Sequence, residues 1–299
     1  MTSVSTMAMP SGSRTRRHVK LPFGALPIPS LLLVAFGLIL PLLLMARYSL
    51  AVYNPADIIA EGLTLENYLK FFTDPFYREV LGRTVWVAAL TTLFCLVLGI
   101  PAAYVISRTK SPVLRTVLIL GSIIPLLMGN AVRVAGWMVL LADRGLVNET
   151  LLVLNVVDAP VRIMYTLTAV LLSLVAVLLP FMIITLQSVF DRIDGAYEEA
   201  AATLGAPPWT AFFRIFVPLS MPGIFSGGLL VFILSMNAYA SPVLLGGPTF
   251  HMMAPMVYEQ AVKIFNWPFA ASLAFVLMFA TLVLTVVSSV VLQKKYGRM

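Results

Sequence analysis

Charged side chains are scarce in this sequence, and their scarcity excludes most classes of soluble protein. Asp, Glu, Lys and Arg make up 11% of the 299 residues, while hydrophobic residues make up 60%. A soluble domain carries about a quarter charged residues. One aqueous core could not cover this much apolar surface. We therefore interpret the chain as a polytopic membrane protein, for which lipid is much of the solvent.

Cysteine and histidine are also nearly absent. Cys95 is the only cysteine, which excludes a disulfide within the chain and a thiolate metal cluster. It lies in an apolar run and is typical of a small buried hydrophobic residue. The two histidines, His18 and His251, are too few and too far apart for a metal site. We expect this chain to bind no metal or cofactor of its own.

Motifs for catalysis are missing as well. The sequence has no Gly-x-x-x-x-Gly-Lys-Ser/Thr phosphate loop, so we expect no ATP hydrolysis by this chain alone. Phe225-Ser-Gly-Gly-Leu229 is superficially similar to an ATPase signature. However, Gly223-x-x-x-Gly227 at the start of an apolar run more simply permits close helix packing. A membrane-embedded enzyme is disfavoured, because no paired carboxylates, His cluster or Ser/His/Asp set lies near the end of a run.

Long apolar runs are what the sequence does contain. A helix needs about 20 apolar residues to cross the hydrocarbon layer, and unsatisfied backbone groups in lipid favour helices over open strands. The runs are uniformly apolar, without the alternation typical of a β-barrel. We predict an all-α integral membrane protein with six transmembrane helices, at Ser30–Val52, Leu81–Ser107, Arg115–Leu141, Met164–Val189, Ile224–Leu245 and Phe269–Leu292.

Basic residues collect at alternate ends of these runs, which predicts the orientation of the chain. Cytoplasmic loops of membrane proteins carry an excess of Lys and Arg. With six spans, three basic groups fall on one side, and the opposite loops are acidic. We therefore predict that both termini are cytoplasmic. The basic groups are Arg14, Arg16, Arg17 and Lys20, then Arg108, Lys110 and Arg115, then Lys294, Lys295 and Arg298; the acidic loops hold Asp57, Glu61, Glu66, Asp74 and Glu79, then Asp143, Glu149 and Asp158.

This pattern divides the chain into three parts. We predict a basic cytoplasmic segment over residues 1–29, a transmembrane domain over residues 30–293 and a cytoplasmic tail over residues 294–299. The first apolar run is long, the basic region before it is extended, and no small-x-small site clearly follows it. It is therefore interpreted as a signal anchor rather than a cleaved signal peptide.

The loop over residues 190–218 is acidic although it falls on the basic side of the membrane. The pattern predicts two short helices joined by a bend, with Asp194 as a plausible N-cap and Gly205 in the left-handed position that ends the first helix. Pro207 and Pro208 fit the first turn of the second helix. That helix is predicted to end at Pro218, after an apolar face made by Trp209, Phe212, Phe213 and Phe216. The acidic residues are Asp191, Asp194, Glu198 and Glu199, against Arg192 and Arg214.

Such a unit presents acid on a surface of small residues, because Ala200, Ala201 and Ala202 have almost no side-chain bulk. This suits docking into a groove on a partner protein. The alternative is a pair of amphipathic helices that lie on the membrane with their aromatic residues in the interface. We favour partner docking, because acidic helices are poorly suited to anionic lipid.

The spacing inside this loop resembles a known signature. Glu199-Ala200-Ala201, three residues, Gly205, nine residues and Ile215-Phe216-Val217-Pro218 resemble the EAA signature of ABC-importer permeases. Val217, where the signature has Leu, is the one departure. The resemblance implies the type I ABC-importer permease fold, in which this loop is a coupling helix that sits in a cleft of the cytoplasmic ATPase. It implies that the residues that couple to the ATPase are Glu198, Glu199, Ala200, Ala201 and Gly205, of which Glu199 and Gly205 carry most of the function.

A wider resemblance, over about residues 31–292, is to the polyamine (spermidine/putrescine) permease branch. Related permeases for other small solutes share several of the stretches that carry it. These stretches are Arg133 followed by Trp137, Gly145-Leu-Val-Asn148, Leu179-Pro-Phe-Met182 and Ser241-Pro-Val-Leu-Leu-Gly-Gly-Pro248.

The family resemblance also implies partners and a location. It implies a small organic solute such as a polyamine, and a bacterial inner-membrane complex. That complex contains two ATPase subunits, a like or homologous second permease and an external solute-binding protein. ATP and Mg²⁺ would then be bound by the partner ATPase.

Polar residues inside apolar runs are costly and are candidates for the solute path. We assign Asn130, Arg133 and Trp137 in the third run and Asn237 and Tyr239 in the fifth. Each has a structural alternative. Arg133 could pair with a backbone carbonyl or a partner permease, and the others could serve packing or the membrane interface.

The charge of Arg133 has the wrong sign for a cationic solute. The nearest carboxylates, Asp143 and Glu259, are predicted to lie outside the membrane, although Tyr239 could supply a cation–π contact. An anionic or zwitterionic solute therefore stays open, as does a path lined largely by a second permease. An ion-gradient-driven secondary transporter is the remaining alternative. The sequence shows no inverted repeat and no mid-span Asp or Glu to support it.

Overall fold

The computed structural model describes residues 28–55 and 62–296, with side chains over residues 30–55 and 62–290. Several residues of the sequence analysis fall elsewhere, so the predictions that rest on them stay predictions. Outside the described residues lie Arg14, Arg16, Arg17, His18, Lys20, Asp57, Glu61 and Arg298, and outside the described side chains lie Lys294 and Lys295.

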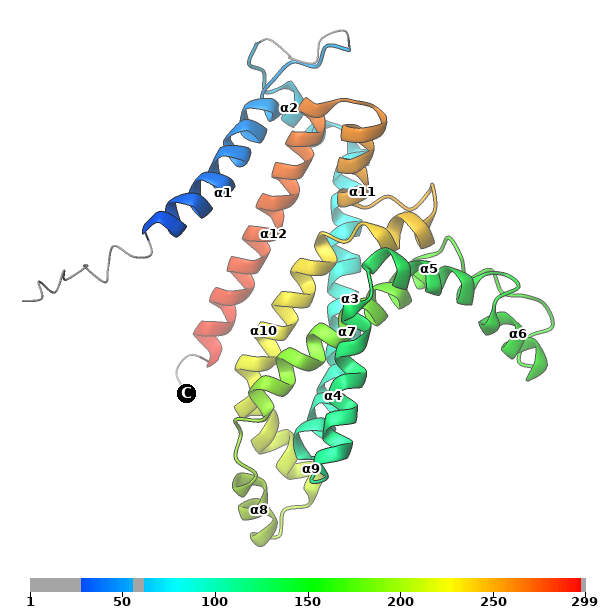
Figure 1. Cartoon of the computed structure of the whole chain (residues 1–299), viewed down its shortest axis with the longest axis vertical. Helices are drawn as coiled ribbons and strands as arrows, with labels where there is room; N and C mark the ends of the chain where they lie inside the picture. The colour runs from blue at the N-terminus through cyan, green and yellow to red at the C-terminus, as the bar shows by residue number, and fades with distance from the viewer. Residues whose placement is uncertain (1–27, 56–61, 297–299) are drawn as a thin grey trace, which may run out of the picture. The chain divides into compact units, whose positions relative to one another are not determined.

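The described residues are largely helical, as predicted (Figure 1). The first helices are α1 (Ile28–Ser49), α2 (Glu66–Thr73), α3 (Pro75–Arg108), α4 (Pro112–Leu127), α5 (Asn130–Leu141), α6 (Leu146–Val153) and α7 (Leu167–Phe190). The others are α8 (Ala196–Thr203), α9 (Pro208–Ala211), α10 (Val217–Met236), α11 (Met253–Tyr258) and α12 (Trp267–Tyr296), with π-helical turns η1 (Phe212–Phe216), η2 (Pro242–Gly246) and η3 (Glu259–Lys263).

The helices long and apolar enough to cross a membrane are close to the predicted set. Five qualify: α1, α3, α7, the run from α9 to α10, and α12. A sixth span is reached if α4 and the following segment Asn130–Val153, which meet at a bend of 99°, are counted together. The predicted helical fold class is confirmed, and five spans plus one bent pair are roughly consistent with the predicted six.

The third apolar run, Arg115–Leu141, is therefore not one continuous helix. α4 ends one residue before Met128, which takes an extended conformation and donates its N–H to Pro125 O. Gly129, with ψ 138°, is also outside helical geometry. Proline restricts the backbone around it, and glycine tolerates conformations that other residues avoid. The two together give a physical reason for the bend, which the average hydropathy of the run does not reveal.

The fifth span lies earlier in the chain than the predicted range Ile224–Leu245. α9, η1 and α10 form one apolar run over Pro208–Met236. The chain leaves this run at Asn237, whose side-chain Nδ2 donates to Ile233 O at 2.9 Å. The backbone N–H of Asn237 also donates to Ile233 O, at 3.3 Å, so this carbonyl accepts two hydrogen bonds from the residue that ends the helix.

By its contacts the chain divides into two units, Met1–Met45 and Ala46–Met299. In the first unit, the large apolar side chains of α1 from Leu31 to Leu44 are exposed. Exposed apolar side chains along a helix of this length are expected where lipid is the solvent. The second unit holds the elements that position the candidate site.

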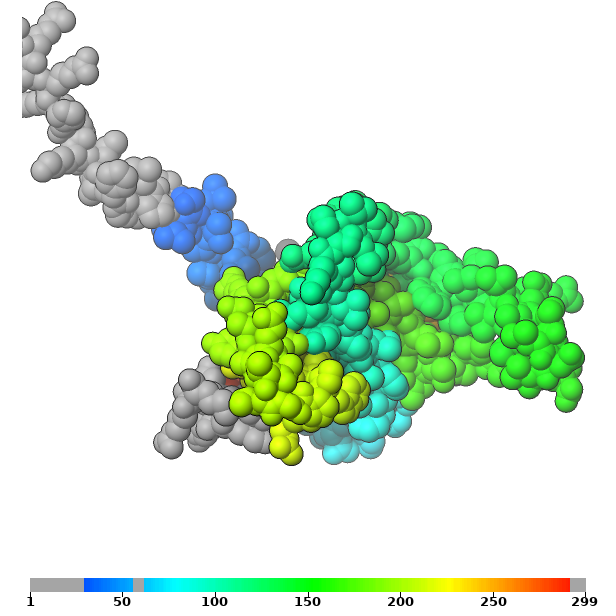
Figure 2. Space-filling view, turned by 90° about the horizontal axis from the view of Figure 1, so that it is seen from below, coloured from blue at the N-terminus to red at the C-terminus, as the bar shows by residue number. Residues whose placement is uncertain are grey.

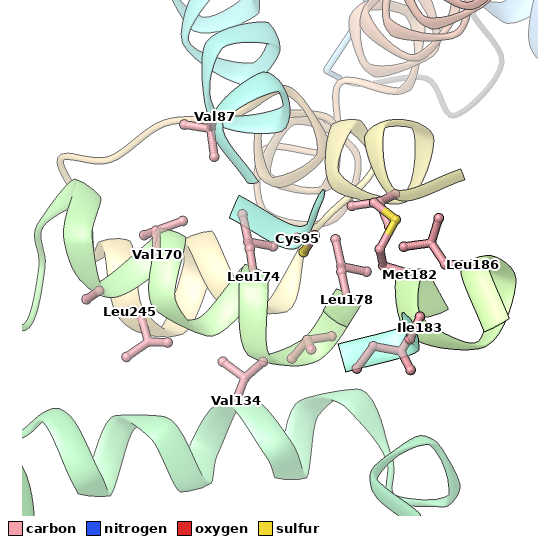
Figure 3. Close-up of a cluster of buried hydrophobic side chains, with 14 of the residues drawn as sticks. Val87, Cys95, Val134, Val170, Leu174, Leu178, Met182, Ile183, Leu186 and Leu245 are labelled. Carbon is pink, nitrogen blue, oxygen red and sulfur yellow. The ribbon is translucent and has the colours of Figure 1, made fainter. Parts of the chain in front are cut away.

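In the second unit, α3, α7 and α10 pack side by side around a shared core (Figure 1). Figure 3 shows Leu174 and Met182 of α7 in one cluster with Cys95 of α3, while Val134 reaches the cluster from α5. Cys95 is fully buried, which confirms its interpretation as a small hydrophobic residue.

Two glycines of α10 allow its close approach to α7, which confirms the packing predicted for this pair. A Cβ on Gly223 would lie 2.7 Å from Val189 Cβ, and a Cβ on Gly227 would lie 2.9 Å from Met182 Sδ. A Cβ does not pack this close to a carbon or sulfur atom without displacement. The absence of a side chain at both positions therefore sets the distance between the helices.

Gly223→Leu is expected to destabilise the permease. Overpacking a tight contact costs about 1–3 kcal/mol, so the midpoint of thermal unfolding of the purified protein in detergent should fall. Gly82→Leu is the matched control, since nothing lies within 4 Å of a Cβ at Gly82 in α3. Equal midpoints for the two variants would show that the Gly223 contact does not constrain the helices.

Candidate functional site

The loop over residues 190–218 lies at one end of the second unit, beyond the last turns of α3 and α7 (Figure 1). Figure 2 looks onto this end, where yellow-green residues of the loop lie beside blue-green residues at the start of α4. The opposite end of the unit carries α2, the start of α3 and the start of α12, where Tyr77 and Phe269 pack edge to face at 4.9 Å.

The first half of the loop forms a short helix followed by a left-handed Gly205, as the sequence predicts, but the N-cap residue is Gly195 and not the predicted Asp194. α8 spans Ala196–Thr203, and Asp194 Oδ1 accepts a hydrogen bond from the N–H of its first residue at 3.0 Å. Gly205 follows the helix with φ +81°. Ala206 N then donates to Ala201 O at 3.0 Å, which gives the last turn the bonding of a Schellman motif. A left-handed residue is required at Gly205, and glycine adopts this conformation without strain.

The second half of the loop does not end at Pro218, contrary to the prediction. α9 begins at Pro208, as predicted, and the helical run continues to Met236. Pro218 falls in the first turn of α10, directly after the π-helical turn in which Val217 N donates to Phe212 O. Proline has no N–H, and its ring clashes with the carbonyl four residues earlier. The wider π-turn before Pro218 lets the helix continue.

Glu198 of α8 points into the permease rather than away from it. Its carboxylate accepts hydrogen bonds from Arg108 Nη2 at 2.6 Å, Arg108 Nε at 2.9 Å and Tyr104 Oη at 2.7 Å. Arg108 Nη1 also donates to Ile193 O at 3.0 Å. We call this group, Tyr104, Arg108, Glu198 and the carbonyl of Ile193, the clamp. It ties α8 to the last turn of α3.

The charged side chains of the clamp are largely shielded from solvent, so their hydrogen bonds contribute to the stability of the fold. The side chains of Arg108 and Glu198 are 24% and 21% exposed. Hydrogen bonds to charged groups contribute about 1.5–3 kcal/mol, against about 0–1 kcal/mol for an exposed ion pair. The guanidinium of Arg108 also lies 5.1 Å from the centre of the Phe216 ring, a cation–π contact. Loss of either charged partner would leave the other without its counter-ion.

A second ion pair helps to explain why this loop is acidic. Arg115 Nη2 lies 2.6 Å from Asp191 Oδ2 and joins the start of α4 to the end of α7. Asp191 and Glu198 are thus both paired with basic residues that flank the loop between α3 and α4. Since the two loops contact each other, they lie at the same end of the unit. Two of the four acidic residues of the loop, Asp191 and Glu198, are thus paired with bases.

The aromatic residues that follow Gly205 do not form the single face that the sequence suggests. Phe216 is fully buried and packs edge to face on Tyr104 and on Phe190, each at 4.8 Å. Trp209 and Phe213 are instead 74% and 51% exposed. The buried ring of Phe216 therefore packs the loop against α3 and α7. The exposed members leave an apolar surface beside α8.

The predicted coupling residues divide between two faces of the loop. Glu198 is held in the clamp, and Ala201 is buried at 6% exposure. Leu204, which the sequence analysis does not single out, is 90% exposed next to the bend. The exposed face of α8 and the bend after it therefore combines a carboxylate, small residues and one exposed leucine. The predicted coupling residues on it are Glu199, Ala200 and Gly205.

Because the third apolar run is broken, three predicted path residues lie in α5, after the bend, and not in the middle of a continuous helix. Asn130 begins α5 and is exposed, and Trp137, two turns on, is half-buried. Arg133 lies in the first turn of α5, and its Nη1 donates to Val177 O of α7 at 3.3 Å. Its Nε is buried and makes no hydrogen bond within the described part of the chain. The structure thus contains the backbone contact that was the structural alternative for Arg133.

The other two path residues lie beyond α10 rather than inside a span. Asn237 caps that helix, and Tyr239 lies three residues past its end. The Tyr239 ring packs on Tyr258 with centroids 4.9 Å apart. Burial and the neighbouring Tyr258 raise the pKa of Tyr239, so its phenol stays neutral.

The clamp residues Tyr104 and Arg108 are functional candidates that the sequence analysis did not assign. The opposite charges of two loops on the same side of the membrane are the only sequence signal for them. Within residues 28–55 and 62–296, no group of three or more His, Cys, Asp or Glu side chains could hold a metal ion.

Residues 95–295 match the family described as the binding-protein-dependent transport system inner membrane component. The chain belongs to this family. It is 37% identical over 233 residues to the spermidine/putrescine transport system permease protein PotB of Escherichia coli (strain K12), covering 78% of this chain and 84% of that protein. It is 33% identical over 250 residues to PotB of Haemophilus influenzae, covering 83% and 87%.

A solved structure of a bacterial alginate ABC transporter, in complex with a periplasmic protein bound to an alginate pentasaccharide, has a similar fold. The TM-score is 0.74 at 17% identity, over 89% of this chain and 91% of that chain. Together these findings make the chain the multi-pass permease subunit of an ABC importer, a transport component and not an enzyme. The secondary-transporter alternative is thereby set aside.

Proposed function

We propose that this permease imports a polyamine such as spermidine or putrescine. The observation that carries the proposal is the 37% identity, over most of both chains, to a spermidine/putrescine permease. Arg133 donates to the Val177 carbonyl, which gives its guanidinium a structural role in the contact between α5 and α7. Asn130, Trp137, Asn237 and Tyr239 remain our candidates for the solute path.

The permease works in a complex of several chains in this proposal. Two ATPase subunits bind ATP and Mg²⁺, a like or homologous second permease completes the path, and an external solute-binding protein delivers the solute. Both termini of this chain are cytoplasmic. Residues 1–29 form the basic leading segment, residues 30–293 the membrane domain and residues 294–299 the tail. The paired loops that contain Arg108 and Glu198 support one shared cytoplasmic end.

Coupling runs through α8 and the clamp. The exposed face with Glu199, Ala200 and Gly205 sits in a groove of the ATPase, and Leu204 adds apolar contact. When the ATPases close on ATP they displace α8. Glu198 passes this displacement through Arg108 to α3, which packs on α7 and α10. The helices around the path then tilt together, because a close-packed core shifts between discrete arrangements rather than deforming.

The proposed ATP-driven import of a polyamine is tested with the complex reconstituted into proteoliposomes. ATP is sealed inside, so that only complexes whose ATPase subunits face the interior can use it, and complexes inserted in the opposite orientation do not contribute. Radiolabelled spermidine and the loaded binding protein are then added outside. We expect uptake that requires the enclosed ATP and persists when an uncoupler dissipates the proton gradient. Uptake without ATP, or uptake abolished by the uncoupler alone, would contradict ATP-driven import. ATP-driven uptake of another solute but not of a polyamine would overturn the polyamine assignment.

A further inference from the structure

A cavity of about 490 Å³ lies at the end of the unit opposite α8, between η2, α11 and η3. Its volume is in the range of small-molecule sites. In one wall of the cavity, Tyr165 packs tightly against the segment that contains Leu245 and Gly247. Tyr165 N donates to Leu245 O at 2.9 Å, and the Tyr165 ring lies so near Gly247 that a Cβ there would overlap it. Gly247 has φ +69°, a conformation that favours glycine.

Tyrosine rings and one carboxylate line this cavity. Tyr165, Tyr239 and Tyr258 contribute aromatic surface, and each is between 38% and 46% exposed. Glu259 follows Tyr258 in the chain, also lines the cavity and is half-buried. No ion pair or side-chain hydrogen bond engages the Glu259 carboxylate within the described part of the chain. A half-buried carboxylate without a counter-ion, next to aromatic faces, attracts a cation.

Two basic side chains also face the cavity, and they define its polarity. Lys263 lies one turn beyond Glu259 and is exposed, so its ammonium extends into solvent. His251 packs edge to face on Phe76 with centroids 5.3 Å apart. Glu259 is therefore the anionic group that lines the cavity, and it is less exposed to solvent than Lys263.

We propose that this cavity binds one alkylammonium group of the transported solute, with Glu259 as counter-ion and Tyr239 and Tyr258 as the aromatic faces. The inference rests on the proposed function, since it assigns to the polyamine a first site on the permease. The site holds a single ammonium because it offers a single carboxylate. The remaining ammonium groups of a polyamine extend from the cavity toward the rest of the path or a second permease.

The charge preference of the cavity can be measured without transport. Val243 lines it and is 40% exposed, so Val243→Cys in the assembled complex places a reporter thiol there. The native Cys95 is fully buried and should not react. The thiol is modified with a cationic reagent, trimethylammonium-ethyl methanethiosulfonate, or with an anionic one, sulfonatoethyl methanethiosulfonate. We expect a higher ratio of cationic to anionic rates than the same two reagents show with a small free thiol in solution.

Two substitutions should move this ratio in opposite directions. Glu259→Gln should lower it about fivefold, as removal of one nearby charge does at an effective dielectric between protein and water. Lys263→Gln should raise it. Glu149→Gln, an exposed carboxylate on α6 outside the cavity, is the matched control and should leave the ratio unchanged. A ratio that does not respond to Glu259→Gln would overturn the proposal.

Protection by solute separates this inference from the proposed function. Spermidine should slow modification of the thiol, and Glu259→Gln should remove the protection. Tyr258→Phe should keep the protection, whereas Tyr258→Leu should reduce it, because only the first retains an aromatic face. If tetramethylammonium protects and spermidine does not, the cation site stands and the polyamine assignment fails. If neither protects while the complex still imports spermidine, the site is wrong and the function stands.

Discussion

Gly205→Val is expected to lower solute uptake by at least about tenfold while the permease still folds and inserts. Gly205 has φ +81°, and a residue with a Cβ pays about 1–2 kcal/mol in that conformation, more if it is β-branched. The bend after α8 should therefore shift, and the exposed face of α8 should lose its position. Each 1.4 kcal/mol corresponds to a factor of ten in an equilibrium. Uptake and solute-stimulated ATPase activity of the reconstituted complex measure the effect.

Gly195→Val is the matched control for this prediction. Gly195 lies at the other end of α8 with φ −60°, and nothing lies within 4 Å of a Cβ at this position. Gly195 is the N-cap residue of α8 and contributes no side-chain hydrogen bond, and the contact of Ala196 N with the Asp194 carboxylate does not depend on a glycine at position 195. A loss of uptake as large in Gly195→Val as in Gly205→Val would mean that the left-handed conformation is not what matters.

Arg108→Ala is expected to uncouple ATP hydrolysis from transport. The guanidinium of Arg108 makes three hydrogen bonds of the clamp, and without it the carboxylate of Glu198 is left half-buried with one remaining donor, Tyr104. Breaking such a pair costs about 1.5–3 kcal/mol locally. We expect α8 to detach from α3, so that the complex hydrolyses more ATP per solute molecule imported. The ratio of ATP hydrolysed to solute imported is the measurement.

Three further variants test whether the effect of Arg108→Ala comes from loss of the clamp. Arg108→Lys should restore coupling only in part, because an ammonium cannot reproduce the planar guanidinium contacts with Glu198 and Ile193. Arg108→Ala with Glu198→Gln should be less damaged than the sum of the single changes. Arg192→Ala removes an exposed arginine of the same loop that makes no side-chain hydrogen bond within the described residues, and it should behave as the wild type. Equal ratios in Arg108→Ala and Arg192→Ala would remove the clamp from the coupling route.

Local chemistry in the coupling loop could be read from the sequence because each feature depends on nearby residues. Gly205 and Pro208 act on their own backbone and occupy the predicted positions, whereas the N-cap falls on Gly195, one residue after the predicted Asp194. The apolar runs likewise gave the spans, since the requirement for apolar length is a property of composition.

The errors arise where a local rule competes with its surroundings. The sequence predicts that the helix ends at Pro218. In the structure a π-helical turn directly before Pro218 accommodates the proline, which lacks an N–H, and the helical run continues. Composition alone also hid the bend near Gly129, because hydropathy averages over backbone conformation. Boundaries that depend on one turn of backbone are thus harder to predict than the existence of a span.

Contacts between distant segments are the part that the sequence could not supply. The clamp joins residues 90 positions apart, Arg108 and Glu198, and its only trace was an acidic loop on the basic side of the membrane. The cavity joins Tyr239, Tyr258 and Glu259 with Tyr165 from the segment before α7. Charge and periodicity do not determine which loops meet, so these groups became visible only in the folded chain.

Photo-crosslinking from Leu204 is the most direct test of the central claim, that the exposed face of α8 is where the permease meets its ATPase. A photoreactive phenylalanine analogue replaces Leu204, which is 90% exposed beside α8, or Leu63, which is 79% exposed at the opposite end of the unit. The account predicts an adduct with the ATPase subunit from position 204 and none from position 63 in the intact complex. An intact complex that gives no ATPase adduct from position 204, or gives one from position 63, would contradict it.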